Sequence, residues 1–438
     1  MKKTLFAVML VMGGAVFLCS PRLWADSEIF NPSPEILMSN LLTNHEEIRT
    51  YRQGVKQAQG LVRQSRGLYY PSLNLYGDTG FEKIDKEYHD DTDEFRHQVT
   101  LRGTQLITDF GKTTGTIKKD RLFLEQSKAT LELTRQRLMR DGIAAYINIV
   151  KARERIKTAQ YSEARIKELT GIEKTLVEKG AGLSSNVLQA KSHLAGAMAL
   201  RVKAQGELEI AQNRFQALFY HFPTNADVNT FQKIAFPGAL IPGTLDDSLA
   251  QANKAFPEIQ ISRLDLEMGR EAVQISKSTF YPTLNLFAEA IHADNDNGSQ
   301  GERKDYSTGI EFQYNLFNGG SDTAAVKSAL AIRDGASSRL EHIKKQVREQ
   351  VRNSWNQLAT LRQRKELLDQ QTDILKNFLE LAKKERTMGV RPLLDVLSGE
   401  VNYINARGEA IAAQEDMKIA AFNLIYAMGA MNIDIFTP

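Results

Sequence analysis

The sequence is poor in cysteine and shows no excess of charge of either sign. Its one cysteine, Cys19, excludes a disulfide scaffold, a cysteine zinc site and an iron–sulfur cluster. Its 56 lysines and arginines nearly balance 53 aspartates and glutamates, whereas proteins that coat nucleic acid are strongly basic. We therefore expect no nucleic-acid partner. Because 42% of the 438 residues are hydrophobic, the chain can bury a core.

No apolar run reaches the roughly 20 residues that a membrane-spanning helix needs. The longest run, residues 5–18, follows two lysines, which is typical of a signal peptide with Ala25 as its last residue. A lipoprotein modified at Cys19 is the alternative, but Leu18 stands where Gly or Ala would be expected. We therefore predict a signal peptide over residues 1–25 and an exported bacterial protein.

Proline is absent from residues 72–222 and 283–391, whereas four prolines lie within 223–257. Since proline inside a helix costs about 3 kcal/mol, both proline-free blocks can hold very long helices. Apolar residues recur at spacings of three and four over 340–361 and along 131–150, which predicts an apolar stripe on each helix. Helices of this length indicate coiled-coil-like packing or a tube.

The two blocks are copies of one repeat. Residues 70–75 (YPSLNL) reappear as residues 281–286 (YPTLNL), a shift of 211 residues (281 − 70). Gly180 and the segment after it match Gly389 and its following segment at a shift of 209 residues (389 − 180). We predict a first repeat over 26–222, a linker over 223–244, a second repeat over 245–428 and a C-terminal segment over 429–438.

Each repeat contains two segments whose apolar residues alternate with polar ones, so strands are expected at about 70–83, 94–107, 281–292 and 305–317. Apolar outer faces with aromatic ends are typical of a transmembrane barrel, but a soluble hairpin packed on one face would show the same alternation. Four strands cannot close a barrel, so strands in a membrane would require an oligomer. The outward-facing residues would be Leu284, Leu286, Tyr306, Ile310, Phe312 and Tyr314.

No catalytic, metal or cofactor site is expected. The seven histidines have no metal-ligand spacing, and no phosphate-binding or dinucleotide motif is present. The run from Asp294 to Asp305 is acidic, but a calcium loop of the EF-hand type needs Gly at its sixth position and Glu at its twelfth. Here Gly298 is fifth and Asp305 is twelfth, so we expect a solvated loop.

Taken together, these features resemble the TolC family of outer-membrane channel proteins. The marks are the two Tyr-Pro dipeptides before strands, the sequence Leu316-Phe317-Asn318-Gly319-Gly320 before the second long helix, and the tip segments 180–190 and 389–397. The resemblance implies a mainly α fold with a transmembrane β-barrel. Long helices would form a periplasmic α-barrel, and four strands per chain would complete a homotrimeric, twelve-stranded barrel in outer-membrane lipid.

The resemblance further implies a passive exit duct that extends from the cell outer membrane into the periplasm. It would dock through a periplasmic adaptor, a membrane fusion protein, onto an inner-membrane ABC or proton-driven exporter. Residues 391–408 favour type I protein secretion over drug or small-molecule efflux. Residues 223–244 and 429–438 would lie at the waist of the helical tunnel. A periplasmic adaptor or a soluble coiled-coil interaction protein is the alternative.

In the family, the helix–turn–helix tips close the periplasmic entrance. By resemblance, Asp395 would contribute to an acidic ring that favours cations, although the second acidic position of the family is Ser398 here. Asp395 could instead only favour the start of a helix. The gate residues would be Asp395, Arg391 and Asn186, and the tip residues that dock to the adaptor would be Gly180, Leu183, Ser184, Gly389 and Leu393.

Overall fold

The computed structural model describes residues 30, 33–85, 87 and 91–436. The expected signal peptide therefore lies outside the described residues. Apart from Phe30, the described residues belong to one compact unit. None of the helices in the described ranges is both long enough and apolar enough to span a membrane.

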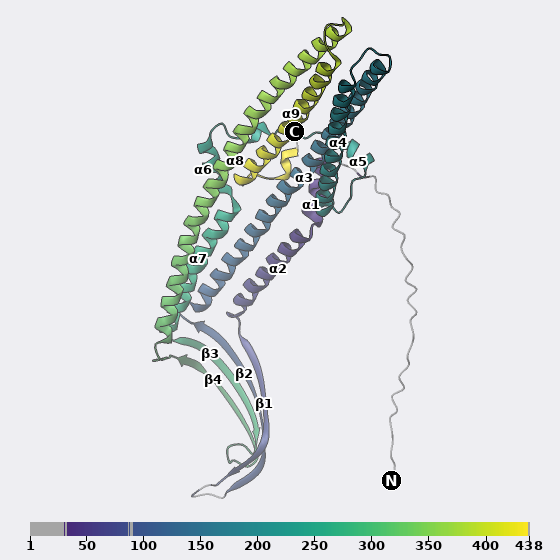
Figure 1. Ribbon diagram of the computed structural model, residues 1–438. Coiled ribbons are helices and arrows are strands. Elements are labelled where there is room, and N and C mark those ends of the chain that lie inside the picture. Colours follow the sequence, from purple (N-terminus) through teal and green to yellow (C-terminus); the bar gives the residue numbers. More distant parts are fainter. Residues whose placement is uncertain (1–29, 31–32, 86, 88–90, 437–438) are drawn as a thin grey trace, which may run out of the picture. The chain divides into compact units, whose positions relative to one another are not determined.

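Two helices of 67 residues each, α3 (Lys112–Glu178) and α8 (Ser321–Thr387), dominate this unit. Neither contains proline, and at about 1.5 Å per residue each spans about 100 Å. Each turns back into a shorter antiparallel partner, α4 (Ser184–Phe219) after α3 and α9 (Leu393–Ala427) after α8. The two hairpins lie at the end of the unit opposite the strands (Figure 1).

Shorter helices pack along the other half of the long ones. Helix α2 packs on α3, and α7 packs on both α3 and α8, so four helices run side by side next to the sheet (Figure 1). The shorter helices are α1 (Pro34–Asn44), α2 (Glu46–Gly67), α5 (Asn225–Thr230), α6 (Leu245–Ala255) and α7 (Pro257–Lys277), with single 3₁₀ turns at Gly238–Leu240, Ser278–Phe280 and Ile433–Phe436.

One antiparallel sheet has the strand order β1-β2-β3-β4. The strands are β1 (Ser72–Ile84), β2 (Thr92–Thr108), β3 (Thr283–Asp294) and β4 (Glu302–Gln313). A bulge interrupts the pairing of β2 with β3 between Leu106 and Thr108.

The last strand is shorter than alternation predicted, and it ends at Gln313 instead of residue 317. Tyr314, which we expected within this strand, therefore lies one residue beyond it. The reason is the partner strand: Gln313 pairs with Thr283, and the residue before Thr283 is Pro282. Because proline has no N–H group, it cannot extend the hydrogen-bond ladder.

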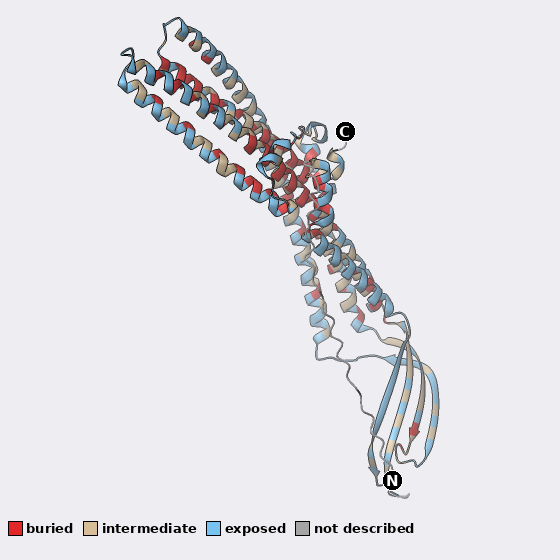
Figure 2. Cartoon of the chain, turned by 90° about the vertical axis from the view of Figure 1, so that its right-hand side faces the viewer, coloured by how far each residue is buried: buried red, intermediate tan, exposed pale blue. Residues whose placement is uncertain are grey.

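The buried core lies in the helices and is concentrated where α3 and α9 pack together near the middle of the unit (Figure 2). The sheet contributes little to this core, because few strand residues are buried. The largest fully buried side chains of the core include Tyr146, Phe215, Phe256 and Phe422. A single copy of the chain therefore has a packed helical body and a sheet with many exposed apolar side chains.

The segment between α4 and α6 is attached to the middle of α3 by polar contacts. The Tyr146 hydroxyl accepts a hydrogen bond from the backbone N–H of Gln232 at 3.0 Å, and its ring packs against Phe231 with centroids 4.8 Å apart. Burial raises the pKa of Tyr146 to about 12, although the N–H of Gln232 and the charge of Arg153 act in the opposite direction. This segment includes the linker predicted over 223–244.

The end of α9 fits closely against the junction of α6 and α7. Gly429 has φ 71°, and its N–H donates to the carbonyl of Tyr426 at 2.8 Å. A Cβ atom on Gly429 would lie 2.7 Å from Cα of Phe256 and 2.8 Å from the backbone of Ala255. Both the left-handed conformation and the close approach require glycine at this position.

Candidate functional site

The strand register places the predicted outward-facing residues on one face of the sheet. Leu284 pairs with Phe312, Leu286 pairs with Ile310, and Tyr306 lies opposite Ala290. Leu286, Ile310, Phe312 and Tyr306 are exposed, Tyr306 by 80%, whereas Leu284 is half-buried. On the same face, β1 and β2 contribute further exposed apolar residues, which are Leu73, Leu75, Phe81, Phe95, Val99 and Leu101.

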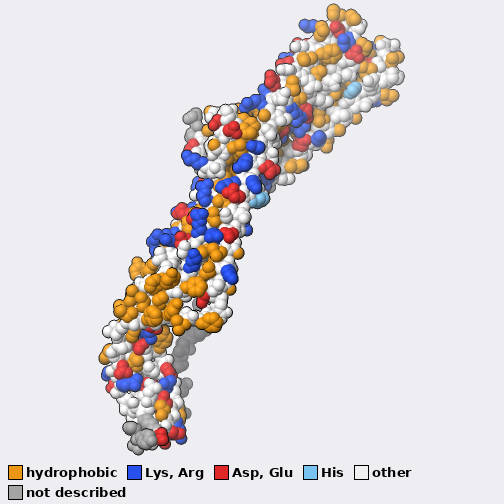
Figure 3. All heavy atoms as spheres, turned by 90° about the vertical axis from the view of Figure 1, so that its left-hand side faces the viewer, with side chains coloured by type: hydrophobic (Ala, Val, Ile, Leu, Met, Phe, Trp, Pro, Cys, Tyr) orange, Lys and Arg blue, Asp and Glu red, His pale blue; other side chains and the backbone are white. Residues whose placement is uncertain are grey.

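Hydrophobic side chains also gather where the sheet meets the long helices (Figure 3). In the chain segment between β4 and α8, Leu316 and Phe317 are among the most exposed hydrophobic residues. Phe110, between β2 and α3, stacks its ring on that of Tyr281, just before β3, with centroids 5.4 Å apart. A continuous exposed apolar surface that extends over four strands of a monomer marks contact with a membrane or another chain.

The opposite face of the sheet is polar and crossed by ion pairs. Arg102 of β2 lies 3.4 Å from the carboxylate of Glu289 on β3 and 2.7 Å from that of Glu311 on β4. Arg96, also on β2, pairs with Asp78 of β1. The sheet thus separates an apolar face from a charged one, as the wall of a water-filled barrel does.

The two hairpin turns have the same backbone structure. The N–H of Gly180 donates to Val177, and the next N–H donates to Leu176, both at 2.9 Å. Gly389 and its following residue make the equivalent bonds, both at 3.0 Å, to Arg386 and Glu385. Each pattern is a Schellman motif, in which glycine adopts positive φ to end the helix.

The side chains around these turns differ between the hairpins. In the second hairpin, Nε of Arg391 lies 2.6 Å from Glu385, and its guanidinium lies 4.0 Å from Asp395. In the first hairpin, Asn186 donates to the buried Glu173 at 3.0 Å. The structure thus brings Arg391 and Asp395 together and places Asn186 in the other hairpin. Glu173 and Glu385 were not anticipated, because neither spacing is a helical i, i+4 pair.

The residues expected to dock an adaptor do not all lie at the surface. Leu183 is 67% exposed at the start of α4, and the turn residues Gly180 and Gly389 are exposed, as is Ser184. Leu393 is only 7% exposed because it packs into an apolar cluster with Leu379 and other residues of the hairpins. Its side chain supports the packing of the hairpins, and its docking role stays a prediction.

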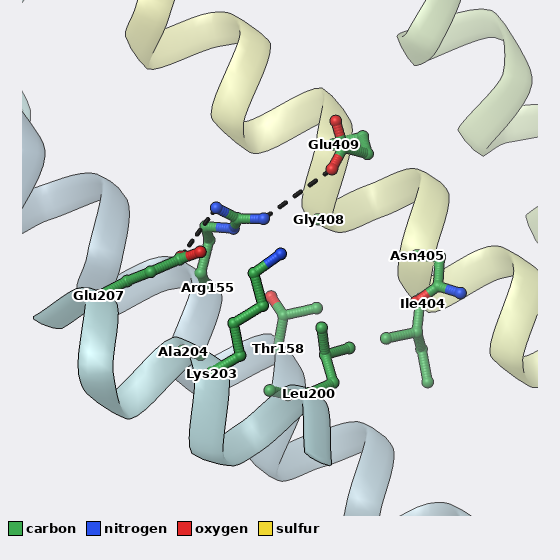
Figure 4. Close-up of a pocket in the computed structure, with 11 residues that line it drawn as sticks. Arg155, Thr158, Leu200, Lys203, Ala204, Glu207, Ile404, Asn405, Gly408 and Glu409 are labelled. Atoms are coloured by element: carbon green, nitrogen blue, oxygen red, sulfur yellow. Dashed lines mark hydrogen bonds and ion pairs between the residues drawn. The ribbon is translucent and has the colours of Figure 1, made fainter. Parts of the chain in front are cut away.

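A pocket between α3, α4 and α9 had no signal in the sequence (Figure 4). Arg155 of α3 projects into it, 2.8 Å from Glu207 of α4 and 3.8 Å from Glu409 of α9. Glu409 also lies 3.0 Å from Arg364 of α8. These four charges link the two hairpins. Their sequence separations of 45 residues or more explain why periodicity could not reveal them.

Across the described ranges, no group of three or more His, Asp or Glu side chains is placed to hold a metal ion. What the arrangement offers is a two-faced sheet joined to long helices that end in two charged or polar tips.

Comparison with protein families gives a match to the model described as outer membrane efflux protein, over residues 37–219 and 248–430. These two ranges cover most of the chain. The outer membrane efflux protein BepC of Brucella suis is 20% identical over 393 residues, which covers 89% of this chain and 84% of BepC. The alkaline protease secretion protein AprF of Pseudomonas aeruginosa is 22% identical over 402 residues, covering 89% and 81%.

Solved structures share the fold. The outer-membrane channel OprN superposes with a TM-score of 0.78 at 19% sequence identity, covering 91% of this chain and 90% of that one. The long paired helices and the four-stranded sheet described above are therefore an architecture already seen in outer-membrane channels.

Proposed function

Because the chain belongs to the outer membrane efflux protein family, we propose that it is the passive exit duct of a tripartite export machine. Family membership makes it a channel of the outer membrane that extends into the periplasm, and not an enzyme. The observation that carries the proposal is the two-faced sheet: one face is apolar and exposed, and the other bears the Arg102 ion pairs.

Three copies would complete the barrel. In the sheet, β1 and β4 each pair on one side only, and an open edge in lipid costs several kcal/mol for each unsatisfied backbone group. Pairing β4 of one copy with β1 of the next removes every open edge. Three copies supply twelve strands, which lies within the range of known membrane barrels and matches the resemblance to the TolC family.

We propose type I protein secretion, with a periplasmic adaptor and an inner-membrane ABC exporter as partners. Support comes from AprF, which is named for secretion of an alkaline protease and aligns over 89% of this chain. Drug or small-molecule efflux with a proton-driven exporter is the second candidate, because BepC is named as an efflux protein. Deleting the ABC and the proton-driven exporter genes of the source bacterium one at a time, and measuring secreted protein and drug sensitivity, separates the two.

The tips would form the periplasmic gate. Threefold symmetry would bring three copies of Asp395 together and concentrate negative potential where the bore is narrowest. The ion pair between Arg391 and Glu385 would hold the second hairpin closed. An adaptor would then contact the exposed turn residues Gly180, Leu183, Ser184 and Gly389.

Planar-bilayer conductance of the detergent-purified protein, with its mass measured in parallel, tests the proposal. We expect a trimer with small, cation-selective openings. A water-soluble monomer without conductance would contradict the proposal and support a periplasmic adaptor or another soluble coiled-coil protein instead.

A further inference from the structure

The chain between β3 and β4, residues 295–301, forms a folded loop, called here the outer loop. Asn295, Asn297, Gly298 and Gly301 have φ between 53° and 94°, a region that Asn and Gly tolerate better than other residues. The Asn295 side chain accepts a hydrogen bond from the N–H of Gly301 at 2.8 Å, and the Asn295 N–H donates to the Gly301 carbonyl at 3.2 Å. The sequence therefore gives the loop a defined shape.

The outer loop bends over the polar face of the sheet. The N–H of Gly298 donates to Glu82 of β1 at 3.0 Å, and the Gln300 side chain donates to Glu94 of β2 at 3.0 Å. Glu82 and Glu94 are direct cross-strand partners. By the alternation of the strands, both lie on the same face as Arg102. The loop thus lies over the outer end of the charged face and not over the apolar face.

A buried carboxylate fixes the loop in this position. The Asp296 side chain is only 2% exposed, and it lies 3.1 Å from Arg96 of β2 and 3.3 Å from Arg303 of β4. Arg96 also pairs with Asp78 of β1. A carboxylate so deeply buried requires charged partners, and here they come from two strands that are not neighbours in the sheet.

We infer that the outer loop is a second constriction, at the outer mouth of the channel, and that Asp296 holds it closed against large solutes from outside. The inference rests on the proposed trimeric channel, because the polar face lines a bore only when the sheet closes. Three copies would each place one loop over the bore. The periplasmic tips control exit, whereas this constriction selects by size what can enter from the medium.

The first part of the test establishes which face lines the bore. Thr100 and Leu101 are consecutive residues of β2, so their side chains lie on the polar and the apolar face respectively. We would treat intact cells carrying Thr100→Cys or Leu101→Cys with a small, membrane-impermeant maleimide. The unaltered chain, whose only cysteine is Cys19, gives the background. Labelling of Thr100→Cys but not of Leu101→Cys supports the proposal that the polar face lines the bore. Labelling of Leu101→Cys but not Thr100→Cys would overturn the proposed channel, and the inference with it.

The second part tests the loop. A maleimide carrying a long poly(ethylene glycol) chain should label Thr100→Cys slowly, because it must wait for the loop to open. Adding Asp296→Ala should raise this rate by about tenfold or more, as expected from the loss of a charge-assisted hydrogen bond. Asp294→Ala, which removes the same charge from the apolar face two residues earlier, is the matched control and should leave the rate unchanged.

Asp296→Asn provides a second variant that preserves shape, in case the alanine variant assembles poorly. Trimer yield and the rate of labelling by the small maleimide show that each variant is assembled. In the opposite outcome, the large reagent labels Thr100→Cys equally fast with and without the Asp296 substitutions while the small reagent still labels it. This result would contradict the constriction but not the proposed channel.

Discussion

Arg153, in the middle of α3, donates a hydrogen bond of 2.7 Å to the carbonyl oxygen of Phe231. The same guanidinium nitrogen lies 3.3 Å from the carbonyls of Val228 and Asn229. One buried arginine thus binds three backbone acceptors of the segment that follows α4 and fixes it to the long helix.

Replacing Arg153 by methionine should lower the free energy of unfolding by about 3 kcal/mol, because buried carbonyls would lose their charged donor. Urea unfolding of the detergent-solubilised protein measures this, and limited proteolysis should show earlier cleavage within 223–244. Arg155→Met is the control, since Arg155 makes more exposed ion pairs and should cost about 1 kcal/mol or less. Equal costs for the two variants would contradict the structural role of Arg153.

Alkaline pH should destabilise the protein through Tyr146. Its pKa is raised from 10.0 to about 12, so between these values the unfolded chain ionises this hydroxyl and the folded chain does not. Stability from this group is therefore complete below pH 10 and falls above it by about 1.4 kcal/mol per pH unit, until pH 12. Unfolding midpoints measured against pH, compared with those of Tyr146→Phe, check the slope. A variant that loses stability equally steeply would exclude Tyr146 as the source.

Gly429→Ala should unfold or misassemble the region where α9 meets α6 and α7. The new Cβ would lie 2.7 Å from backbone atoms that cannot move independently, and it would also force alanine into positive φ. We expect a loss of at least about 2 kcal/mol. Gly60→Ala in α2, where nothing lies within 4 Å of the new atom, should be neutral or stabilising by up to about 1 kcal/mol. Thermal unfolding of both variants in detergent decides the comparison.

Arg391→Ala should increase the single-channel conductance, because it removes the 2.6 Å contact with Glu385 and the stacking of the guanidinium over Phe378. Glu385→Ala should act in the same direction, and the double variant should add little, since both changes break one pair. Lys384→Ala removes a neighbouring positive charge from an exposed position and serves as the control. A conductance that rises only for Lys384→Ala would show that the ion pair of Arg391 and Glu385 does not close the channel.

Leu101→Arg should prevent assembly in the membrane. Leu101 lies opposite Leu75 and Ala290 in the interior of the apolar face, where an arginine facing lipid costs about 2–4 kcal/mol. Thr100→Arg, one residue earlier, points to the polar face and should assemble. Phe312→Arg should cost less, about 0–1 kcal/mol, because Phe312 is one residue from the end of β4. The yield of trimer in the outer-membrane fraction is the measurement.

Local patterns in the sequence were enough to predict the long helices and the four strands. The absence of proline and the spacings of three and four indicated the long helices, and alternation indicated the four strands and their apolar face. The resemblance to the TolC family gave the two turns at Gly180 and Gly389, where glycine ends each helix in the left-handed conformation. These features depend on residues that are close together in the chain.

Contacts between distant segments could not be predicted in this way. Arg96 and Asp296 are 200 residues apart, and Arg153 and Phe231 are 78 apart, so no periodicity connects them. Leu393 illustrates the same difficulty, since a leucine at a turn is exposed or buried according to how the two hairpins pack. The end of β4 at Gln313 depended on a proline in the partner strand.

The identical turns at Gly180 and Gly389 carry different chemistry. Counting 209 residues on from Gly182 and Asn186 gives Arg391 and Asp395, so the same backbone carries two uncharged residues in one repeat and an oppositely charged pair in the other. In a trimer, six turns of equal backbone shape would stand around the entrance, and every second one would carry the pair Arg391 and Asp395. A ring-shaped partner would meet two kinds of contact in alternation, and high salt would weaken the charged contacts more than the others.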